Sequence, residues 1–293
     1  MPRRITKPAP VPTEMITVGD QRIRVAVREG DGIEPPLLLM NGLGVSFEGL
    51  QAFVDALDPS TTVIRFDVPG VGESPTPGAP YRFWGVSRLV TGMLDVLGYE
   101  QVDVLGVSWG GALAQQFAFQ NPRHCRRLVL VSTSSGVTIP GSLSIFTEVF
   151  SRKRYTDPEH ARKVGPRIYG GRLRSDADAT VRILQHVRPN LRGHIFQQLA
   201  VLGWTSLPFA RLIRQPTLIM TGDDDPIIAP VNARILHAVL PNAKLHVFHD
   251  GHLGLLTSAA ELAPIVEDFL YGERADSRSE QPVPEQMAVA AEG

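Results

Sequence analysis

Short apolar runs alternate with longer amphipathic segments over the first half of the chain. The runs are continuous and strand-sized, as expected for parallel strands that are buried on both faces. Between them, apolar residues recur with the spacing of a helix face. Alternating strands and helices predict an α/β fold whose mostly parallel sheet carries helices on both faces. The predicted strands are Leu37–Met40, Val63–Phe66, Val102–Val107 and Leu128–Val131, and the predicted helices are Phe47–Leu57, Phe83–Leu97 and Ala112–Phe119.

The pattern extends in both directions along the chain. Met15–Val18 and Arg22–Val27 alternate in character around Gly19 and Asp20, which predicts a β-hairpin before the first run. Strand patterns resume near the C-terminal end, so the core is predicted to comprise residues 14–136 and 210–271. Its last elements are the strands Pro216–Met220 and Lys244–Phe248 and the helix Ala260–Leu270.

Residues 137–209 interrupt this alternation. They contain arginine-rich helical segments, several prolines and no clear strand. An insertion of this kind after the sixth strand predicts a helical cap over the functional site, although most of its apolar residues should simply pack on the core. Outside core and cap, residues 1–13 are predicted to be a flexible leader, and the polar residues 272–293 a disordered tail.

Composition narrows the class of protein. Of the 293 residues, 43% are hydrophobic and 20% charged, so the chain can bury a large core. A net charge of −1 gives no reason to expect nucleic acid or an anionic membrane as a partner, and favours a neutral or apolar substrate. Because residues 1–13 lack an apolar signal core and the apolar stretches are strand-sized, neither a secretory signal nor a transmembrane helix is expected.

The only cysteine, Cys125, cannot form an intramolecular disulfide, which fits a reducing compartment. We therefore expect a cytoplasmic protein. Cys125 also lacks the turn that a nucleophile needs, so a structural role is expected for it.

Ser108 carries the strongest chemical signal in the sequence. It lies between Gly106 and Gly110, at the end of an apolar run and at the start of a helix-like segment. A sharp strand-to-helix turn can lift a serine hydroxyl clear of a sheet only if its neighbours are nearly bare backbone. A tight structural turn would also fit the pattern, but the flanking strand and helix favour a nucleophilic serine.

The chain resembles the α/β-hydrolase superfamily over roughly residues 15–270. In that fold a serine, an acid and a histidine follow one another along the chain, the last two on loops after late strands. The resemblance rests on the segments Gly42–Gly44, Asp67–Ser74, Gly106–Gly111, Gly222–Pro226 and Gly251–His252.

Three consecutive carboxylates follow the strand Pro216–Met220. The third, Asp225, stands three residues after Gly222 and directly before Pro226, which matches the usual position of the acid in this fold. Some of the three must be no more than a solvated turn. We expect Asp225 to orient the catalytic histidine, with Asp224 as the alternative.

The histidine is expected at His252. It follows a glycine at the exit of the last strand, where a loop can turn the imidazole toward Ser108. His249 lies nearer the strand and is the competing candidate, expected to face structure or solvent instead. A serine is activated only when a histidine removes its proton and a carboxylate orients that histidine, so the three positions predict a Ser108–His252–Asp225 triad.

The oxyanion of an acyl-transfer reaction needs two N–H donors. The fold places one on the residue after the nucleophile, Trp109, and the other on the loop after Leu37–Met40, which implies Leu43. Many relatives have His-Gly where this chain has Asn41-Gly42, so Asn41 is either a substrate contact or a support for the loop. Trp204 and Leu253 are further predicted substrate contacts.

A narrower similarity links the chain to the intracellular depolymerases of medium-chain-length polyhydroxyalkanoates. It implies a cytoplasmic serine esterase that cleaves the poly(3-hydroxyalkanoate) of storage granules, without a cofactor, through Ser108, Asp225 and His252. Two cap segments share the similarity, so it goes beyond the general fold. The matching segments are Phe66–Gly72, Pro80–Phe83, Gly106–Ala118, Ile168–Gly171, Leu202–Ser206 and Gly222–Pro226.

Other functions remain open from the residues alone. A small-molecule carboxylesterase, a lactonase or a carbon–carbon bond hydrolase would use the same triad with a different pocket. A noncatalytic ligand-binding or granule-surface protein would not need all three groups. A dehalogenase or epoxide hydrolase would need an aspartate at Ser108. Asp67–Ser74 is glycine-rich but has no phosphate-binding pattern, and no Cys/His cluster or H-E-x-x-H spacing implies a metal.

Overall fold

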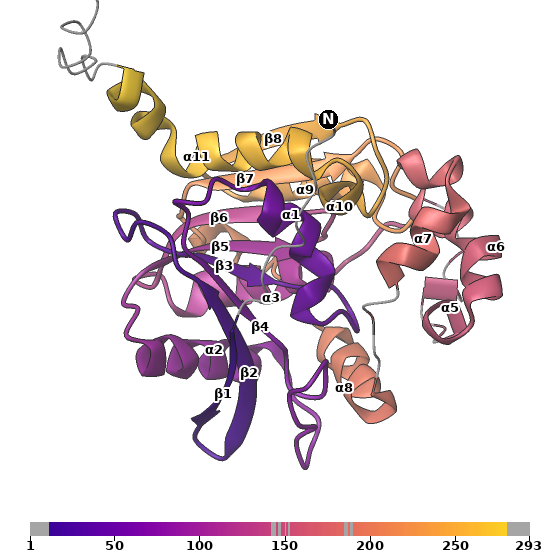
Figure 1. Ribbon diagram of the computed structural model, residues 1–293, viewed down its shortest axis with the longest axis horizontal. Coiled ribbons are helices and arrows are strands. Elements are labelled where there is room, and N and C mark those ends of the chain that lie inside the picture. Colours follow the sequence, from indigo (N-terminus) through magenta and orange to yellow (C-terminus); the bar gives the residue numbers. More distant parts are fainter. Residues whose placement is uncertain are drawn as a thin grey trace, which may run out of the picture.

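An eight-stranded sheet forms the centre of the molecule (Figure 1). The computed structural model describes residues 12–141, 145, 148–149, 151, 153–184, 187 and 190–279. The strands are β1 Thr13–Val18, β2 Gln21–Arg28, β3 Leu37–Met40, β4 Val63–Phe66, β5 Val102–Val107, β6 Cys125–Val131, β7 Thr217–Gly222 and β8 Ala243–Phe248. Their order in the sheet is β1-β2-β4-β3-β5-β6-β7-β8.

The first two strands form the predicted hairpin at one edge of this sheet. Val18 pairs with Gln21 across a two-residue turn, in which Gly19 has a φ of 61°. Glycine adopts such a positive φ without a steric penalty, which is what a short hairpin turn requires. β2 then pairs antiparallel with β4, and all later pairs are parallel. The carboxyl ends of the parallel strands therefore meet at one edge of the sheet.

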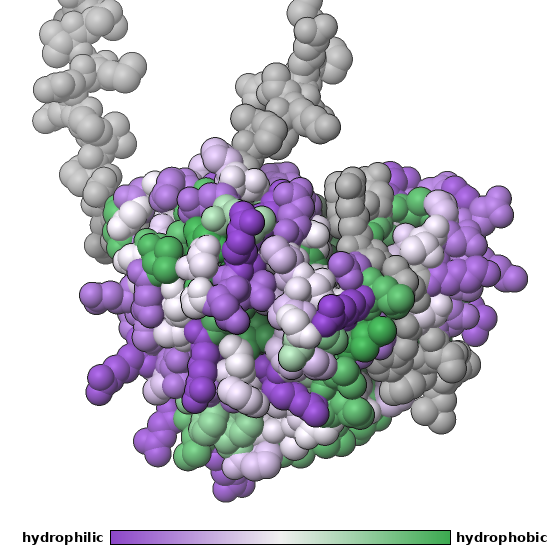
Figure 2. All heavy atoms as spheres, turned by 90° about the horizontal axis from the view of Figure 1, so that it is seen from below, coloured by the Kyte–Doolittle hydropathy of each residue, from purple (hydrophilic) through white to green (hydrophobic). Residues whose placement is uncertain are grey.

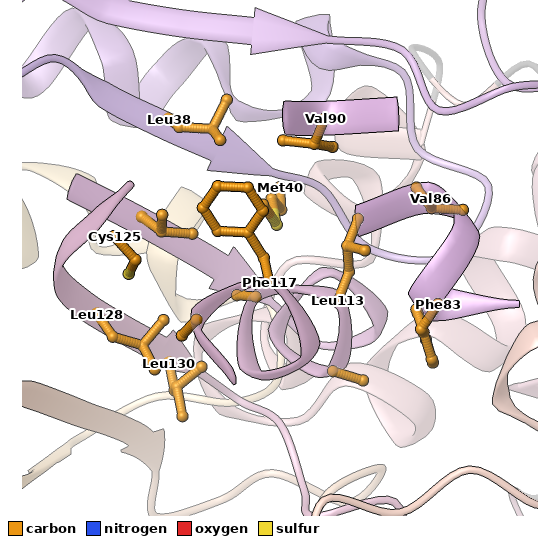
Figure 3. Close-up of a cluster of buried hydrophobic side chains, with 14 of the residues drawn as sticks. Leu38, Met40, Phe83, Val86, Val90, Leu113, Phe117, Cys125, Leu128 and Leu130 are labelled. Atoms are coloured by element: carbon orange, nitrogen blue, oxygen red, sulfur yellow. The ribbon is translucent and has the colours of Figure 1, made fainter. Parts of the chain in front are cut away.

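Both faces of the sheet are buried. Successive residues of β3 point to opposite sides, as in any strand, so Leu38 and Met40 belong to one hydrophobic cluster, and Leu37 and Leu39 to another. In Figure 3, Phe117 lies with Leu38 and Met40 in the first cluster. The helices of the first cluster are α2 Phe83–Leu97, α3 Trp109–Gln120 and α9 Pro230–Val239, and those of the second are α1 Gln51–Ala56, α10 Gly254–Thr257 and α11 Ala259–Ser279.

These layers confirm the predicted α/β-hydrolase architecture, with small differences. The predicted helix Phe47–Leu57 is a 3₁₀ turn, η1 Phe47–Leu50, followed by α1. The helix α9 was not predicted. Residues 272–279 continue α11 beyond a non-helical Tyr271, although they were expected to belong to a disordered tail. Their alanine, glutamate and arginine content favours a helix. The expected leader up to residue 11 and the tail from residue 280 lie outside the described residues.

The described residues of the insertion after β6, the predicted cap, form helices joined by turns and irregular segments and contain no strand, and the helices fall into two parts. The first part has its own hydrophobic cluster, which includes Ile168, Leu173 and Leu184. The second part is one helix that packs on the core. Its Ala200 belongs to the first hydrophobic cluster of the sheet, and the ring of its Phe196 meets that of Tyr81 edge-to-face at a centroid distance of 6.2 Å. The first part comprises α5 Lys153–Thr156, α6 Pro158–Tyr169, η3 Gly171–Arg174 and α7 Ala177–Leu184, and the second is α8 Leu191–Val201.

Apolar side chains at both ends of α8 are exposed to solvent. Leu191 is 53% exposed and Leu202, which follows the helix, is 68% exposed. Figure 2 views the molecule from the side on which α8 lies in Figure 1, and shows apolar side chains gathered on part of that face. Within the described part of the chain, no helix has the length and apolar character needed to cross a lipid bilayer.

Candidate active site

Ser108 occupies the turn between β5 and α3. Its φ of 54° and ψ of −115° lie in a region that residues with a side chain rarely adopt, and such strain is often found at functional sites. The turn is possible because its neighbours are glycines. A Cβ atom on Gly106 would lie 2.4 Å from the carbonyl oxygen of Gly110, and one on Gly110 would lie 2.0 Å from that of Met40. The glycine frame is therefore a steric requirement.

His252 lies between the serine and an acid. Its Nε2 is 3.2 Å from Ser108 Oγ, and its Nδ1 is 2.8 Å from Asp225 Oδ2. The backbone N–H of His252 donates to the carbonyl of Tyr169 at the end of α6, at 2.7 Å, so the cap holds the histidine loop. This arrangement can take a proton from the Ser108 hydroxyl while the carboxylate fixes the imidazole orientation.

Asp225 is fully buried and has two acceptor roles. Its Oδ1 accepts the backbone N–H groups of Ile227 and Ile228, both at 2.9 Å, which leaves Oδ2 for His252. These N–H donors fix the carboxylate plane relative to the ring. The geometry therefore supports Asp225 over Asp224 as the orienting acid.

The competing acid, Asp224, and the competing histidine, His249, have other partners. Asp224 accepts from Arg174 Nη2 at 2.6 Å and from the N–H of Gly171 at 2.7 Å. The hydrogen bond from Arg174 lowers the pKa of Asp224 below its ordinary value. His249 is exposed to solvent and its Nδ1 lies 2.5 Å from Asp223 Oδ2, away from Ser108.

The two expected oxyanion donors have no acceptor among the residues that the structure describes. No group in the described part of the chain accepts a hydrogen bond from the backbone N–H of Leu43 or of Trp109. The Asn41 side chain is buried and its Nδ2 donates to the carbonyl of Ser46 at 2.6 Å, which closes the loop. This contact supports the loop-holding interpretation of Asn41, and its role as a substrate contact stays a prediction.

The other two expected substrate contacts have structural partners. Trp204 Nε1 donates to Gln116 Oε1 on α3 at 2.8 Å, and its ring contacts Phe83 at 5.0 Å. Leu253 directly follows His252 and packs against the cap cluster. Both assignments to the substrate pocket stay predictions.

Asp250 was missed by sequence reasoning. It is 2% exposed and accepts hydrogen bonds from the hydroxyls of Thr257 and Ser258, both at 2.6 Å, and from the N–H groups of Arg172 and Gly251. Burial raises the pKa of Asp250, but these donors outweigh it and the net pKa is lowered. The carboxylate thereby anchors the loop that carries His252 to η3 of the cap.

Gln197 was also missed, because its partners are far away in sequence. It is buried on α8, its Oε1 accepts the N–H of Gly44 at 2.7 Å, and its carbonyl accepts the indole N–H of Trp109 at 2.9 Å.

Among the residues described, no group of three or more His, Cys, Asp and Glu side chains could hold a metal ion.

Comparisons with known proteins identify the family of the chain. Residues 35–259 match the family described as alpha/beta hydrolase fold. A poly(3-hydroxyalkanoate) depolymerase of Ectopseudomonas oleovorans is 46% identical over 269 residues, which are 91% of this chain and 95% of that protein. A 2-hydroxymuconate semialdehyde hydrolase of Pseudomonas sp. (strain CF600) is 30% identical, over 86% of this chain and 94% of that protein.

Solved structures share the fold at lower identity. The enol-lactonase from Burkholderia xenovorans LB400 superposes with a TM-score of 0.75 at 24% identity, covering 88% of this chain and 99% of that one. The sheet order, the glycine-framed serine turn and the family match lead to one conclusion. The chain belongs to the α/β-hydrolase family.

Proposed function

We propose that this protein is a serine esterase that hydrolyses poly(3-hydroxyalkanoate), with medium-length side chains, through an acyl-enzyme intermediate. The hydrogen-bonded line from Ser108 through His252 to Asp225 is the observation that carries the chemistry. The substrate class rests on the 46% identity to a poly(3-hydroxyalkanoate) depolymerase, which extends over nearly the whole chain.

The reaction is an acyl transfer in two halves. Ser108 Oγ attacks the ester carbonyl while His252 Nε2 takes the hydroxyl proton, and His252 then gives that proton to the departing alkoxide. Water attacks the acyl-enzyme next, His252 takes one of its protons, and the proton returns to Ser108 Oγ as the acid product leaves. Asp225 holds the imidazole tautomer throughout and stabilises the charged ring.

The negative charge that develops on the carbonyl oxygen requires donors that are already oriented. The free backbone N–H groups of Leu43 and Trp109 are suited to this role, and each such donor is worth on the order of 3 kcal/mol of transition-state stabilisation. Trp109 N–H also lies at the first position of α3, where the positive end of the helix dipole adds to the field.

The protein surface fits a neutral, apolar polymer. The net charge is −1, and Leu191 and Leu202, at the two ends of α8, are exposed. Figure 2 shows apolar side chains gathered on part of the face seen from the side on which α8 lies. A polyester offers no charge for recognition, so apolar contact is the available attraction. We place the enzyme in the cytoplasm, at the surface of polyester granules.

The test is turnover of a medium-chain polyhydroxyalkanoate latex, with product analysis by mass spectrometry. Wild type should clear the latex and release 3-hydroxy acids or short oligomers, and Ser108→Ala should do neither while keeping the circular dichroism spectrum. Ser175→Ala, an exposed serine of the cap, is the matched control and should keep full activity. Activity retained in Ser108→Ala would refute the nucleophile.

A second function is favoured by one finding. The relationship to a 2-hydroxymuconate semialdehyde hydrolase suggests a small-molecule hydrolase that uses the same triad. Short p-nitrophenyl esters and a ring-cleavage product should therefore be assayed beside the latex. Fast cleavage of either small substrate with an inert polymer would replace the depolymerase proposal by this one.

A further inference from the structure

The loop that carries the Leu43 donor is held by the cap as well as by the core. The peptide unit between Leu43 and Gly44 is contacted at both ends. Its N–H donates to Gln197 Oε1 at 2.7 Å, and its carbonyl oxygen lies 3.5 Å from the Tyr155 hydroxyl of α5. Because this peptide adjoins the one that bears the Leu43 N–H, fixing its plane restricts the direction of that donor.

The second expected donor is tied to the same cap residue. The side chain of Trp109 extends from the start of α3, and its indole N–H donates to the carbonyl of Gln197 at 2.9 Å. The ring is 6% exposed and packs against Phe83 at a centroid distance of 4.8 Å. One residue of α8 therefore contacts both elements that present oxyanion donors.

Gln197 can hold these elements only if α8 itself is fixed. Gly193 and Gly70 are in backbone contact, since a Cβ atom on Gly193 would lie 1.9 Å from the Gly70 carbonyl oxygen. The Arg82 guanidinium donates to the carbonyls of Leu199 and Leu202 at the C-terminal end of the helix. Both contacts anchor α8 to loops of the core.

We propose that Gln197 is a positioning residue that sets the geometry of the oxyanion hole from the cap. The inference rests on the oxyanion role proposed above for Leu43 and Trp109. Each of the two hydrogen bonds that Gln197 accepts can be removed separately. Gln197→Met deletes the acceptor for Gly44 and keeps the backbone carbonyl, whereas Trp109→Phe deletes the donor to that carbonyl and keeps an aromatic ring.

The experiment measures kcat and KM on p-nitrophenyl hexanoate for wild type, both variants, and Ile195→Met on the exposed face of α8 as the control. We expect kcat to fall by about tenfold to a hundredfold in each variant, because donors displaced by a fraction of an ångström lose much of their effect. KM should change less than about twofold, since the ground-state carbonyl depends little on these donors.

A second measurement separates positioning from general damage. An alkyl trifluoromethyl ketone forms a tetrahedral adduct with the serine and places an oxyanion in the hole, whereas the matching methyl ketone remains mostly trigonal. The inhibition constant of the fluorinated ketone should rise by the same factor by which kcat/KM falls, with that of the methyl ketone unchanged. The control variant should match wild type in all these constants.

The outcomes distinguish this inference from the proposed function. Wild-type kcat in both Gln197→Met and Trp109→Phe would overturn it, and so would a lowered kcat with an unchanged constant for the fluorinated ketone. If wild type leaves the polymer intact but cleaves the short ester, the depolymerase proposal fails while Gln197 is still tested. If Gln197→Met does not fold, Trp109→Phe carries the test alone.

Discussion

At the scale of single residues, three adjacent carboxylates have three different environments. Asp223 meets the exposed His249, Asp224 meets Arg174, and Asp225 is buried against His252. A buried carboxylate whose other oxygen is held by N–H donors keeps an imidazole in one orientation. Chemical identity is the same in all three, so their roles follow from what the fold brings beside them.

This difference predicts opposite outcomes for two adjacent substitutions. Asp225→Asn should lower kcat by about 10⁴-fold, because the amide no longer stabilises the proper tautomer and charge of His252. Asp224→Asn removes the charge of a partly exposed ion pair with Arg174, and the amide oxygen can still accept the N–H of Gly171, so kcat should change less than about threefold. Esterase assays at saturating substrate decide between them, and a larger loss for Asp224→Asn would reverse the assignment.

Asp250 gives a prediction for stability and pH. Its lowered pKa means that the unfolded chain binds the proton more readily, so this carboxylate stabilises the folded protein above the ordinary carboxyl pKa of about 4. That contribution declines once the pH falls below about 4 and is lost as the pH falls through the lowered pKa of the folded protein. Asp250→Asn should be less stable at pH 7 by about 1–3 kcal/mol, because its donors lose an acceptor.

Urea unfolding at several pH values measures this effect. Between pH 5 and pH 3 the wild-type midpoint should fall more steeply than that of Asp250→Asn. Asp178→Asn, which breaks an exposed ion pair with Arg162, serves as the control and should follow wild type within about 1 kcal/mol. Equal slopes for wild type and Asp250→Asn would contradict the prediction.

At the site, sequence predicted the residues that have a local pattern or, like Asp225 and His252, a fixed place in the chain order of the resembled fold. Gly106 to Gly110 reveal the serine turn because the steric need is satisfied within one segment. Asp250 and Gln197 gave no such signal, since their partners come from the cap and from distant loops. Neither residue has a characteristic local pattern or a fixed place in that chain order, so the sequence around it does not indicate these hydrogen bonds.

At the scale of elements, strands buried on both faces were the easiest to predict. β3, β4 and β5 begin and end at the predicted residues, because a continuous apolar run has few alternatives in a parallel sheet. The helix α9 was missed, since only Asn232, Ala233 and Leu236 are buried in it and the apolar stripe is thin. A proline at its first position was the remaining signal.

The contact between α8 and the core leads to a paired glycine prediction. Gly193→Ala forces a Cβ atom against the Gly70 carbonyl and should lower the free energy of unfolding by about 1–3 kcal/mol. Gly85→Ala lies in open space on α2 and should raise it by up to about 1 kcal/mol through helix propensity. Thermal unfolding of both variants checks the two signs, and stabilisation by Gly193→Ala would exclude the close contact.

At the scale of the whole molecule, the layers on either side of the sheet seal its central strands. Cys125 begins β6, is 2% exposed and belongs to the cluster between the sheet and α3 (Figure 3). Burial raises the pKa of the Cys125 thiol well above its ordinary value, which suppresses the reactive thiolate. Its accessibility therefore depends on opening of the core.

Alkylation of Cys125 should accordingly report global unfolding. A thiol reagent should neither label nor inhibit the native protein, and labelling should begin over the same urea range in which circular dichroism is lost. Ser175→Cys supplies an exposed thiol as the positive control and should react at once. Rapid native labelling of Cys125 would mean that β6 opens independently of the rest of the sheet.

The position of Gln197 also bears on how substrate preference can evolve. Connecting segments vary more among relatives of one fold than the scaffold does, and differences in function are grafted there. In this protein, a cap taken from a relative would have to supply an acceptor for the Gly44 N–H as well as a new pocket lining. A chimera that receives the pocket-lining residues of a relative without such an acceptor would acquire a new substrate preference and a lower kcat. Substrate specificity and catalytic rate would therefore evolve together.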